Sequence, residues 1–523
     1  MDIGEEERRS TEIEDTSYRR KMTSFSDPTM GQHSIKLNEA CVKIINTPQF
    51  NRLHNIKQTG ASYHVYPSAK HARFEHSLGT CYWAGEVVRE LKFQQPELGI
   101  TDRDILVVEI AALCHDLGHG PFSHTFDQMF IPLARPDARE WKHEEASILM
   151  FRYLLKANPE VKEYLDLLLD ELDYKFIEEA ILSVDEENEA EWPYKGRPFE
   201  KAFLYDIVSN KSNGFDVDKW DYICRDGVHM SIPTSANLSR IRDNIRVLPA
   251  GPRKRLTICY RDKVKPDLTN LARTRAQLHS FAYQHRTVKV IEIMLVDAML
   301  IADKHIFVTG TNGVLVHLSH TIDDMEAYTK VDDDAVTSVF KRSTAEELKP
   351  ALELYERIAK RHFYAKVGET KTSDPKRNKT IEGGINVKLS SEIAENLAVY
   401  CDSFPNIDAT RLEASLAVMV ADIHGGMKDT NPVEKVWFFE KDKSTPFRYS
   451  KEHLQFDAPP PRQKIIRVFC REDDVDLIEC AKKCFDAWCR ANDFKPPGEM
   501  TDNEGNDDPI FLSQPSSICT DDS

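Results

Sequence analysis

The chain has 523 residues, of which 41% are hydrophobic and 30% charged, and its formal net charge is −17. This hydrophobic content supports a sizeable folded core and excludes a disordered chain. The acidic balance argues against a general binder of polyanions, although a local basic pocket is compatible with it. No apolar run approaches the roughly 20 residues that a membrane-spanning helix needs, so we expect no membrane association.

The first 25 residues are polar and charged, and we expect a flexible tail without a secretory signal. The eleven cysteines include no C-x-x-C pair, which is typical of reduced thiols in the nucleus or cytoplasm. Helical periodicity then begins at Ser34–Ile45. Ile105–Leu117 is strongly apolar, and the glycines and proline after it should end that helix. Gln277–Leu300 has neither Gly nor Pro, so we expect one long helix.

The C-terminal half mixes strand and helix patterns. Strand patterns occur at Arg255–Tyr260, Ile306–Thr309, Val314–Leu318, Val436–Phe439 and Ile465–Cys470. Thr370–Gly384 is predicted to be an exposed linker or mobile loop, and Val475–Arg490 an amphipathic helix. We therefore predict a mainly α protein. It would have a helical core at 26–310, a smaller α+β lobe at 311–495 and a disordered acidic tail at 496–523.

A cluster of ionisable residues follows the apolar helix. The segment Cys114–His124 contains three histidines and an aspartate within ten residues. Such groups at the end of a buried helix are costly unless they are paired or bind a metal, and imidazole with carboxylate suits Zn, Fe or Mn. His115 and Asp116 leave a helix about 100° apart, so both can reach one ion. A hydrogen-bonded polar network is the alternative interpretation.

Further ligands and cations must come from other segments. His76 and Asp218 are candidate ligands, although each taken singly is more often an ordinary polar residue. One predicted helix face carries Arg275, His279, Tyr283 and Arg286. These cationic and aromatic side chains could bind phosphates, a sugar or a base. A solvated face fits that spacing equally well. Tyr222 and Asp226 share a face with Asp218, and Lys219 stands beside them.

At these residues the chain closely resembles the metazoan sterile-alpha-motif and HD-domain deoxynucleoside triphosphate triphosphohydrolases. The resemblance runs from about Ser26 to Lys495, so we expect a homologue that lacks the N-terminal sterile-alpha-motif domain. Its most specific stretches are 73–79, 113–127, 130–136, 192–198, 213–222, 282–285 and 322–330. It implies that the helical core is an HD domain and that the C-terminal lobe serves oligomerisation or allosteric control.

The resemblance also implies roles for individual residues. One transition-metal ion (Zn or Fe, with Mn as a further candidate) would be held by His76, His115, Asp116 and Asp218. Residues acting on the α-phosphate and the leaving triphosphate would be His119, His124, Asp127 and His143. Contacts to the substrate phosphates and deoxyribose would be Gln58, Arg73, Lys219, Tyr222, Asp226, Arg275, Tyr283 and Gln284. The metal would activate water and a histidine would protonate the leaving oxygen, giving deoxynucleoside and inorganic triphosphate.

Regulation in this family implies a homotetramer assembled by GTP or dNTP effectors, bound with Mg at allosteric sites, and a role in dNTP catabolism and antiviral innate immunity. The guanine-specific first site is altered here, because Asn46, Asn51 and His54 stand where the family has Asp, Gln and Arg. The loss of a carboxylate and of a five-donor guanidinium should weaken guanine recognition. Matching second-site residues are Val65, Arg240, Arg261, Lys263, His285 and Arg286. Thr59 replaces a leucine near the substrate, which should loosen base packing.

Two alternatives of other classes stay open. One is a catalytically weak paralogue that binds a partner protein or, weakly, single-stranded nucleic acid, although the charge of −17 counts against a general polyanion binder. The other is an HD phosphohydrolase of another nucleotide. Conservation of the phosphate contacts Arg73, Lys219 and Arg275 relative to the family pattern favours a triphosphate substrate.

Overall fold

The computed structural model describes residues 22–30, 34–136, 138, 140–184, 191–376, 381, 383–399, 403–454 and 462–499. The predicted tails at 1–25 and 496–523 lie mostly outside these residues. The chain forms two compact units. The first contains the described residues of Met1–Ala276, Ile291–Phe363 and His424–Pro461, and the second those of Gln277–Val290, Tyr364–Ile423 and Arg462–Ser523.

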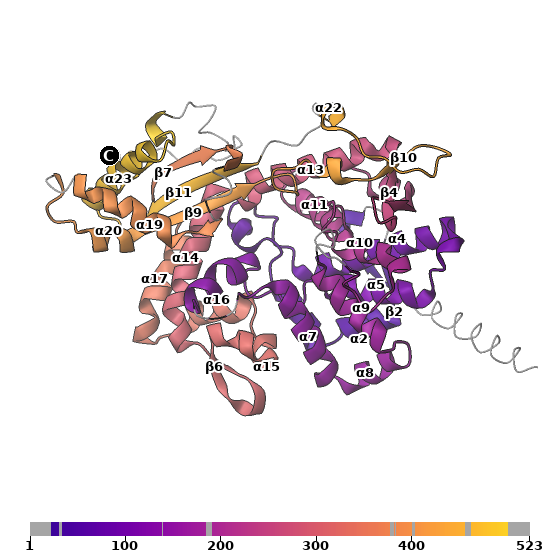
Figure 1. The fold of residues 1–523 in the computed structure, drawn as a ribbon. Coiled ribbons are helices and arrows are strands. Elements are labelled where there is room, and N and C mark those ends of the chain that lie inside the picture. Colours follow the sequence, from indigo (N-terminus) through magenta and orange to yellow (C-terminus); the bar gives the residue numbers. More distant parts are fainter. Residues whose placement is uncertain are drawn as a thin grey trace, which may run out of the picture. The chain divides into compact units, whose positions relative to one another are not determined.

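The first unit is mainly helical, as predicted (Figure 1). Its central helices are α4 (Arg73–Gln94), α5 (Asp102–Cys114), α9 (Glu171–Leu182) and α11 (Val217–His229), with α5 packed on α4 and α9, and α11 packed on α4. Further helices are α2 (Glu39–Ile45), α3 (Pro48–Asn51), α6 (Ile131–Ala134), α7 (His143–Ala157), α8 (Pro159–Asp166), α10 (Tyr205–Val208), α12 (Leu238–Arg242), α15 (Met325–Thr329), α16 (Asp333–Arg342), α17 (Lys349–Ala359), α21 (Pro432–Lys435) and α22 (Lys451–Leu454).

Small sheets accompany these helices in the first unit. Strands β1 (Met22–Ser26) and β2 (Ser34–Asn38) pair antiparallel, as do β5 (Phe307–Thr309) and β6 (Leu315–His317). The third sheet has the order β10 (Phe438–Phe439), β4 (Arg255–Arg261) and β3 (Ile245–Ala250). Residues 34–38 were predicted to be helical but form β2, because their alternating burial suits a strand paired with β1.

Helix α5 shows how the sequence sets the position of the candidate site. Its N-cap Thr101 accepts the N–H of Asp104, and its residues from Asp104 to Cys114 are buried. The helix ends at Cys114, three residues earlier than predicted. The chain continues in tighter turns, in which Leu117 N donates to Cys114 O (3.2 Å) and His119 N to Asp116 O (3.1 Å).

The second unit is built on a four-stranded antiparallel sheet. Its order is β7 (Ala365–Thr372), β11 (Gln463–Cys470), β9 (Leu416–Ile423) and β8 (Gly384–Ile385). Its helices are α19 (Val387–Ala394), α20 (Ala409–Ser415) and α23 (Val475–Ala491). One face packs against α19 and α23 around a core that includes Val468 and Phe485. Cys480 and Cys484 are ordinary buried thiols of that core.

Two further predicted segments differ from the structure. The expected loop at Thr370–Gly384 begins inside β7, where Thr370 is buried and pairs with β11. The expected long helix at Gln277–Leu300 is interrupted. Helix α13 (Lys265–Leu278) gives way to a π-helical turn at His279–Tyr283, and α14 (Arg286–Ala302) follows.

The predicted division at residue 310 also differs from the two compact units. Residues 311–363 and 424–461 belong to the first unit, and 277–290 to the second. The reason is packing: Tyr328 is fully buried within the first unit, and Phe438 pairs with Tyr260 of β4. In the described part of the chain, no helix is long and apolar enough to cross a membrane.

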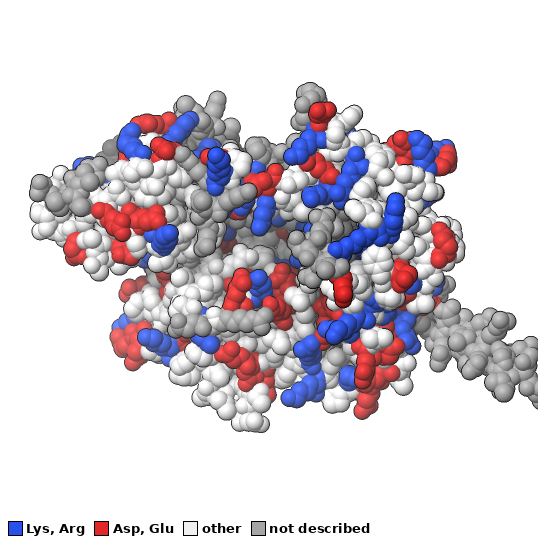
Figure 2. All heavy atoms as spheres, in the orientation of Figure 1, with Lys and Arg blue, Asp and Glu red and all other residues white. Residues whose placement is uncertain are grey.

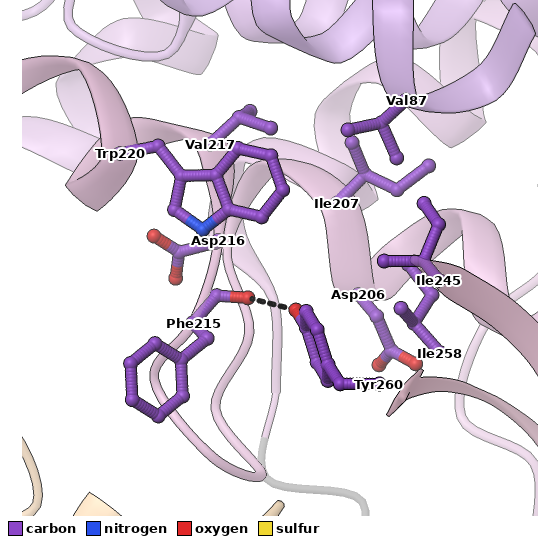
Figure 3. A pocket seen from close by; sticks show the side chains of 10 residues that line it. All are labelled: Val87, Asp206, Ile207, Phe215, Asp216, Val217, Trp220, Ile245, Ile258 and Tyr260. Carbon is purple, nitrogen blue, oxygen red and sulfur yellow. Dashed lines mark hydrogen bonds between the residues drawn. The ribbon is translucent and has the colours of Figure 1, made fainter. Parts of the chain in front are cut away.

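A small pocket lies in the first unit beside the start of α11 (Figure 3). Its lining consists of Val87, Asp206, Ile207, Phe215, Asp216, Val217, Trp220, Ile245, Ile258 and Tyr260. Most of these side chains are apolar, and none is a candidate site residue. On the face of the molecule in Figure 2, basic and acidic side chains are interspersed, in keeping with a protein that is not uniformly anionic.

Candidate active site

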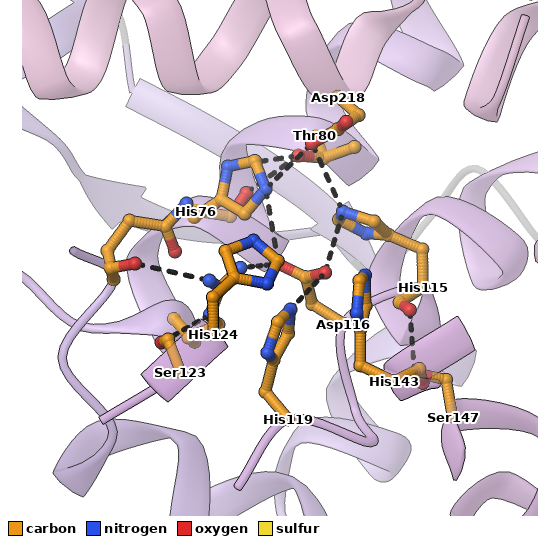
Figure 4. A network of polar contacts seen from close by, with 12 residues as sticks. His76, Thr80, His115, Asp116, His119, Ser123, His124, His143, Ser147 and Asp218 are labelled. Atoms are coloured by element: carbon orange, nitrogen blue, oxygen red, sulfur yellow. Dashed lines mark hydrogen bonds and ion pairs between the residues drawn. The ribbon is translucent and has the colours of Figure 1, made fainter. Parts of the chain in front are cut away.

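Four predicted metal ligands converge from three helices of the first unit (Figure 4). His76 lies in the first turn of α4, His115 and Asp116 directly follow α5, and Asp218 lies in the first turn of α11. His76 Nε2 is 3.4 Å from Asp116 Oδ2 and 3.2 Å from Asp218 Oδ1. His115 Nε2 is 3.5 Å from Asp116 Oδ1 and 3.4 Å from Asp218 Oδ1.

Local capping explains where these side chains start. The Glu75 carboxylate accepts the Ala72 N–H (2.9 Å) at the beginning of α4, which fixes the turn that carries His76. Asp216 is the N-cap of α11 and accepts the Lys219 N–H (3.1 Å), which fixes the turn that carries Asp218. The first turns of α4 and α11 and the C-terminal end of α5 therefore meet at the metal group.

The two imidazoles are oriented by acceptors on their far sides. His76 Nδ1 lies 2.8 Å from Asp221 Oδ2, and His115 Nδ1 lies 2.7 Å from Ala112 O. Protons on Nδ1 would leave both Nε2 atoms with free lone pairs. Both Nε2 atoms are buried and have no hydrogen-bond partner among the described residues. Two imidazole nitrogens and two carboxylates therefore fit a transition-metal ion.

The charges of this group are strongly coupled. Burial would lower the pKa of His76, but the carboxylates of Asp218 and Asp221 raise it to about 10. Burial would raise the pKa of Asp116, yet Arg73 and His115 hold it well below its usual value. His115 and His76 do the same for the pKa of Asp218. The carboxylates of Asp116 and Asp218 are therefore ionised and matched by positive charge, which a bound cation would also supply.

A second group lies beside the first and contains the four predicted catalytic residues. Ligating atoms of His119, His124, Asp127 and His143 lie within 4.8 Å of one another. His143 Nδ1 is 2.9 Å from Asp127 Oδ2, and the ring of His119 stacks on that of His143 at 4.1 Å. His119 Nε2 reaches to 3.4 Å from Asp116 Oδ1, so the two groups adjoin.

The histidines of this second group differ in charge. Burial, with Arg73 and His143 nearby, holds the pKa of His119 well below its usual value, so His119 is neutral. Burial would lower the pKa of His143 as well, but Asp127 raises it above the usual value. His143 therefore holds a proton more readily than His119, and the two imidazoles face each other, an arrangement suited to acid–base chemistry. His124 differs in that its side chain is 52% exposed.

The predicted phosphate contacts lie next to the metal group. Arg73 ion-pairs with Asp116, donates through Nε to Ser123 Oγ (2.9 Å) and through Nη2 to Gln58 O (3.1 Å). Lys219 Nζ lies 4.0 Å from Asp218 Oδ2. Both cations can therefore reach an anion bound at the metal group.

The other predicted substrate residues are divided between the two compact units. Tyr222 OH accepts from Arg275 Nε (3.0 Å), and the Tyr222 ring lies 6.4 Å from that of His76. Asp226 Oδ1 is 2.7 Å from His71 Nε2. Thr59 and Gln58 precede a 3-10 turn at Gly60–His64, with the Thr59 hydroxyl buried. Tyr283 and Gln284 lie in the second unit, at the π-helical turn.

The predicted effector residues form short local groups. Asn46 caps α2, and Asn51 donates to the carbonyls of Ile45 (2.8 Å) and Thr47 (2.9 Å). The His54 ring stacks on Phe74 at 3.5 Å. Val65 ends the 3-10 turn after Thr59, and Arg261 is the last residue of β4. Arg240 Nη2 donates to Lys263 O (2.8 Å), whereas His285 and Arg286 lie in the second unit.

Sequence analysis missed the residues that hydrogen-bond to the candidate ligands and to the backbone around them. Asp221 binds His76 and forms two hydrogen bonds with Arg225 (2.7 and 2.9 Å). A Cβ on Gly79 would lie 1.9 Å from Asp221 Oδ1, so only glycine leaves room for this carboxylate. The Ser147 hydroxyl accepts the Gly118 N–H (2.8 Å) and lies 2.6 Å from His115 O. No spacing rule singles these residues out.

Comparison with known proteins agrees with this geometry. The family model described as HD domain matches residues 73–223, which span the metal group from His76 to Asp218. The fold and the site therefore define an HD-domain protein. The deoxynucleoside triphosphate triphosphohydrolase SAMHD1 of Gallus gallus is 44% identical over 91% of this chain and 76% of its own length. The Homo sapiens protein of that name is 40% identical over 91% and 75%.

A more distant relative extends the match. The SAMHD1 homolog of Dictyostelium discoideum is 31% identical over 89% of this chain and 81% of its own length. The chain belongs to the deoxynucleoside triphosphate triphosphohydrolase SAMHD1 family.

Proposed function

We propose that this chain hydrolyses deoxynucleoside triphosphates to a deoxynucleoside and inorganic triphosphate. The observation that carries the proposal is the convergence of His76, His115, Asp116 and Asp218, with two buried Nε2 atoms aimed at a common point and Arg73 beside it. The name shared by the relatives supports this substrate and reaction. Without His76, Asp218 and Arg73 beside it, the His115–Asp116 pair would be weak evidence for a metal site.

The chain's own residues have distinct tasks in this reaction. The metal, held by the four converging residues, would polarise a phosphoryl oxygen and lower the pKa of water. Arg73 and Lys219 neutralise the phosphates and orient the α-phosphorus toward His119. Water adds to that phosphorus and loses one proton to the solvent, and the bond from phosphorus to the 5′ oxygen breaks. His143, held by Asp127, is the source of the proton that the leaving oxygen takes up, with His119 or exposed His124 between them.

We extend the proposal to cofactor and control. Zn or Fe, with Mn as a further candidate, would occupy the site, and Mg would accompany bound nucleotides. GTP or dNTP effectors would assemble a homotetramer, with weakened guanine recognition at Asn46, Asn51 and His54. In support, the Asn51 amide is bonded to backbone carbonyls and His54 is stacked on Phe74. We place the protein in the nucleus or cytoplasm, in dNTP catabolism and antiviral defence.

A turnover assay tests this function. Purified protein loaded with Zn, Fe or Mn is incubated with dATP, with and without GTP, and triphosphate and deoxyadenosine are quantified. We expect both products in equal amounts, and loss of product and of bound metal in His115→Ala. Absence of triphosphate under every effector would overturn the enzyme proposal and favour the binding alternative. Release of monophosphate or cleavage of a different nucleotide would favour another HD phosphohydrolase. Full activation by GTP would refute the weakened first site.

A further inference from the structure

A remote segment of the first unit holds the loop that carries the candidate catalytic histidines. This loop, residues 117–124, directly follows the His115–Asp116 pair. Tyr328 donates its hydroxyl proton to Gly118 O (2.8 Å), and Asp333 Oδ1 accepts the N–H of Phe122 (2.6 Å). Tyr328 is fully buried and Asp333 is 4% exposed. The two contacts grip the loop near its beginning and near its end.

The same carboxylate also holds a second loop of the site. Asp333 Oδ2 accepts the N–H of Lys57 (3.0 Å), the residue before the predicted substrate contact Gln58. The Ser123 hydroxyl donates to Lys57 O (2.6 Å), so the two loops are joined directly as well. Asp333 is therefore the point at which the loop of His119 and the loop of Gln58 are tied together.

Arg52 completes the contact between the remote segment and the catalytic loop. Its Nη1 donates to Leu117 O (3.1 Å) and its Nη2 to Val331 O (2.9 Å). Its guanidinium carbon lies 4.8 Å from the centre of the Tyr328 ring. The segment Tyr328–Asp333 therefore contacts the catalytic loop directly through a hydroxyl and a carboxylate, and indirectly through Arg52, which bridges Val331 O and Leu117 O.

The loop needs such support because of its backbone conformation. Phe122 and Ser123 both have positive φ angles, 58° and 56°, a region that residues other than glycine rarely adopt. Such conformations persist where the surrounding contacts impose them, and they cluster at functional sites. Ser123 in turn accepts a hydrogen bond from Arg73, so the strained pair lies between the remote segment and a predicted phosphate contact.

Helix capping does not account for the Asp333 carboxylate. Asp332 is the N-cap of α16 and accepts the Ala335 N–H (2.7 Å), whereas both oxygens of Asp333 are directed to the two loops. A buried carboxylate is costly, and burial raises the pKa of Asp333 to about 7, even though the Phe122 and Lys57 N–H groups lower it. The free-energy cost of burying the Asp333 carboxylate is offset by its hydrogen bonds to the Lys57 and Phe122 N–H groups.

We propose that Tyr328–Asp333 is a brace that positions the two loops of the active site, with Asp333 as its principal positioning residue. The inference rests on the proposed function for its catalytic readout. Asp333 touches neither the metal group nor any predicted substrate contact through its side chain. It acts through the backbone of Lys57 and Phe122, and so sets the distance between Gln58 and His119.

The test is Asp333→Asn, with the exposed neighbour Asp334→Asn as the matched control. Asparagine has nearly the same shape but offers one acceptor oxygen, so its NH₂ group would face one of the two backbone N–H groups. We expect kcat to fall at least about tenfold and KM to change less than about twofold, since small misplacements of reacting groups are expensive. Metal content and melting temperature should match those of Asp334→Asn. A kcat within about twofold of wild type would overturn the proposal.

The pH profile separates positioning from general stability. The titratable groups that face Asp333 are Lys57, Arg52, Asp332 and the neutral phenol of Tyr63. Only the ionised carboxylate can accept both N–H groups, so wild-type kcat should fall as pH drops through about 7. Asp333→Asn should lack this step, and profiles of identical shape would contradict the proposal.

Hydrogen exchange keeps the test independent of turnover. Peptides covering 55–60 and 117–125 should exchange faster in Asp333→Asn than in Asp334→Asn, and equal exchange would overturn the brace whatever the activity. A wild-type protein without turnover would refute the proposed function alone. If Asp333→Asn does not fold, Tyr328→Phe decides: faster exchange at 117–125 with reduced kcat supports the brace, and wild-type behaviour overturns it.

Discussion

Replacement of Asp221 by asparagine should weaken metal binding without removing any ligand. The Asp221 carboxylate lies 2.8 Å from His76 Nδ1, and both side chains are at most 1% exposed. It raises the basicity of the imidazole and fixes which nitrogen carries the proton. Asparagine would keep the shape but lose the charge, and Arg225 would keep only Asp27 (2.7 Å) as a carboxylate partner.

The expected size follows from comparable sites. Loss of a carboxylate behind a metal-bound histidine costs about 10-fold to 100-fold in metal affinity, or about 1.4 to 2.7 kcal/mol. The assay is metal competition against a chelator of known affinity, together with dATP turnover at saturating metal. The control is Asp243→Asn, whose carboxylate is 51% exposed and pairs with Arg242 at the surface. An affinity for Asp221→Asn within about twofold of that control would refute the reasoning.

Three further outcomes follow from the site. In Asp127→Asn the pKa of His143 should fall, because Asp127 raises it. Since the acid form of His143 is lost as pH rises through its pKa, the alkaline limb of the kcat profile should move to lower pH, and an unmoved limb would exclude His143 as the acid. Gly79→Ala would place a Cβ 1.9 Å from Asp221 Oδ1. The free energy of unfolding, measured by denaturant melts, should therefore fall by about 1 to 3 kcal/mol. An unchanged free energy of unfolding would disprove the clash. Arg73→Lys keeps the positive charge but loses the guanidinium group that reaches three acceptors. The KM for dATP in steady-state kinetics should therefore rise about tenfold or more. An unchanged KM would argue against a contact between Arg73 and the substrate phosphates.

Local signals predicted the parts of the fold that depend on neighbours in sequence. The apolar run before His115 predicted α5, and the histidines after it indicated a site at that helix end. The break after Leu278 was missed, since a π-helical turn leaves the apolar spacing almost unchanged. Residues 34–38 were assigned to a helix because spacings of three and four also occur by chance in a short strand.

The site itself was only partly within reach of sequence reasoning. His115 and Asp116 are adjacent, but His76 and Asp218 meet them through the packing of α4 and α11 on the core. The residues alone made these two no more than candidates, and the family resemblance singled them out. Asp221, Ser147 and Asp333 act through contacts between residues 29 to 211 positions apart in sequence. Periodicity reports which face of an element is buried, and not which partner it meets.

The Ser147 hydroxyl gives the two histidine groups a common reference point. It accepts the Gly118 N–H and lies 2.6 Å from His115 O and 2.8 Å from His143 O, so one atom touches the backbone of both groups. A Cβ on Gly118 would come within 2.2 Å of the Ser147 nitrogen, which leaves no slack between α7 and the loop. The separation between the metal group and His143, the proposed proton donor, is thus fixed by the backbone. A change in substrate size must be absorbed elsewhere, by the walls around the base and sugar.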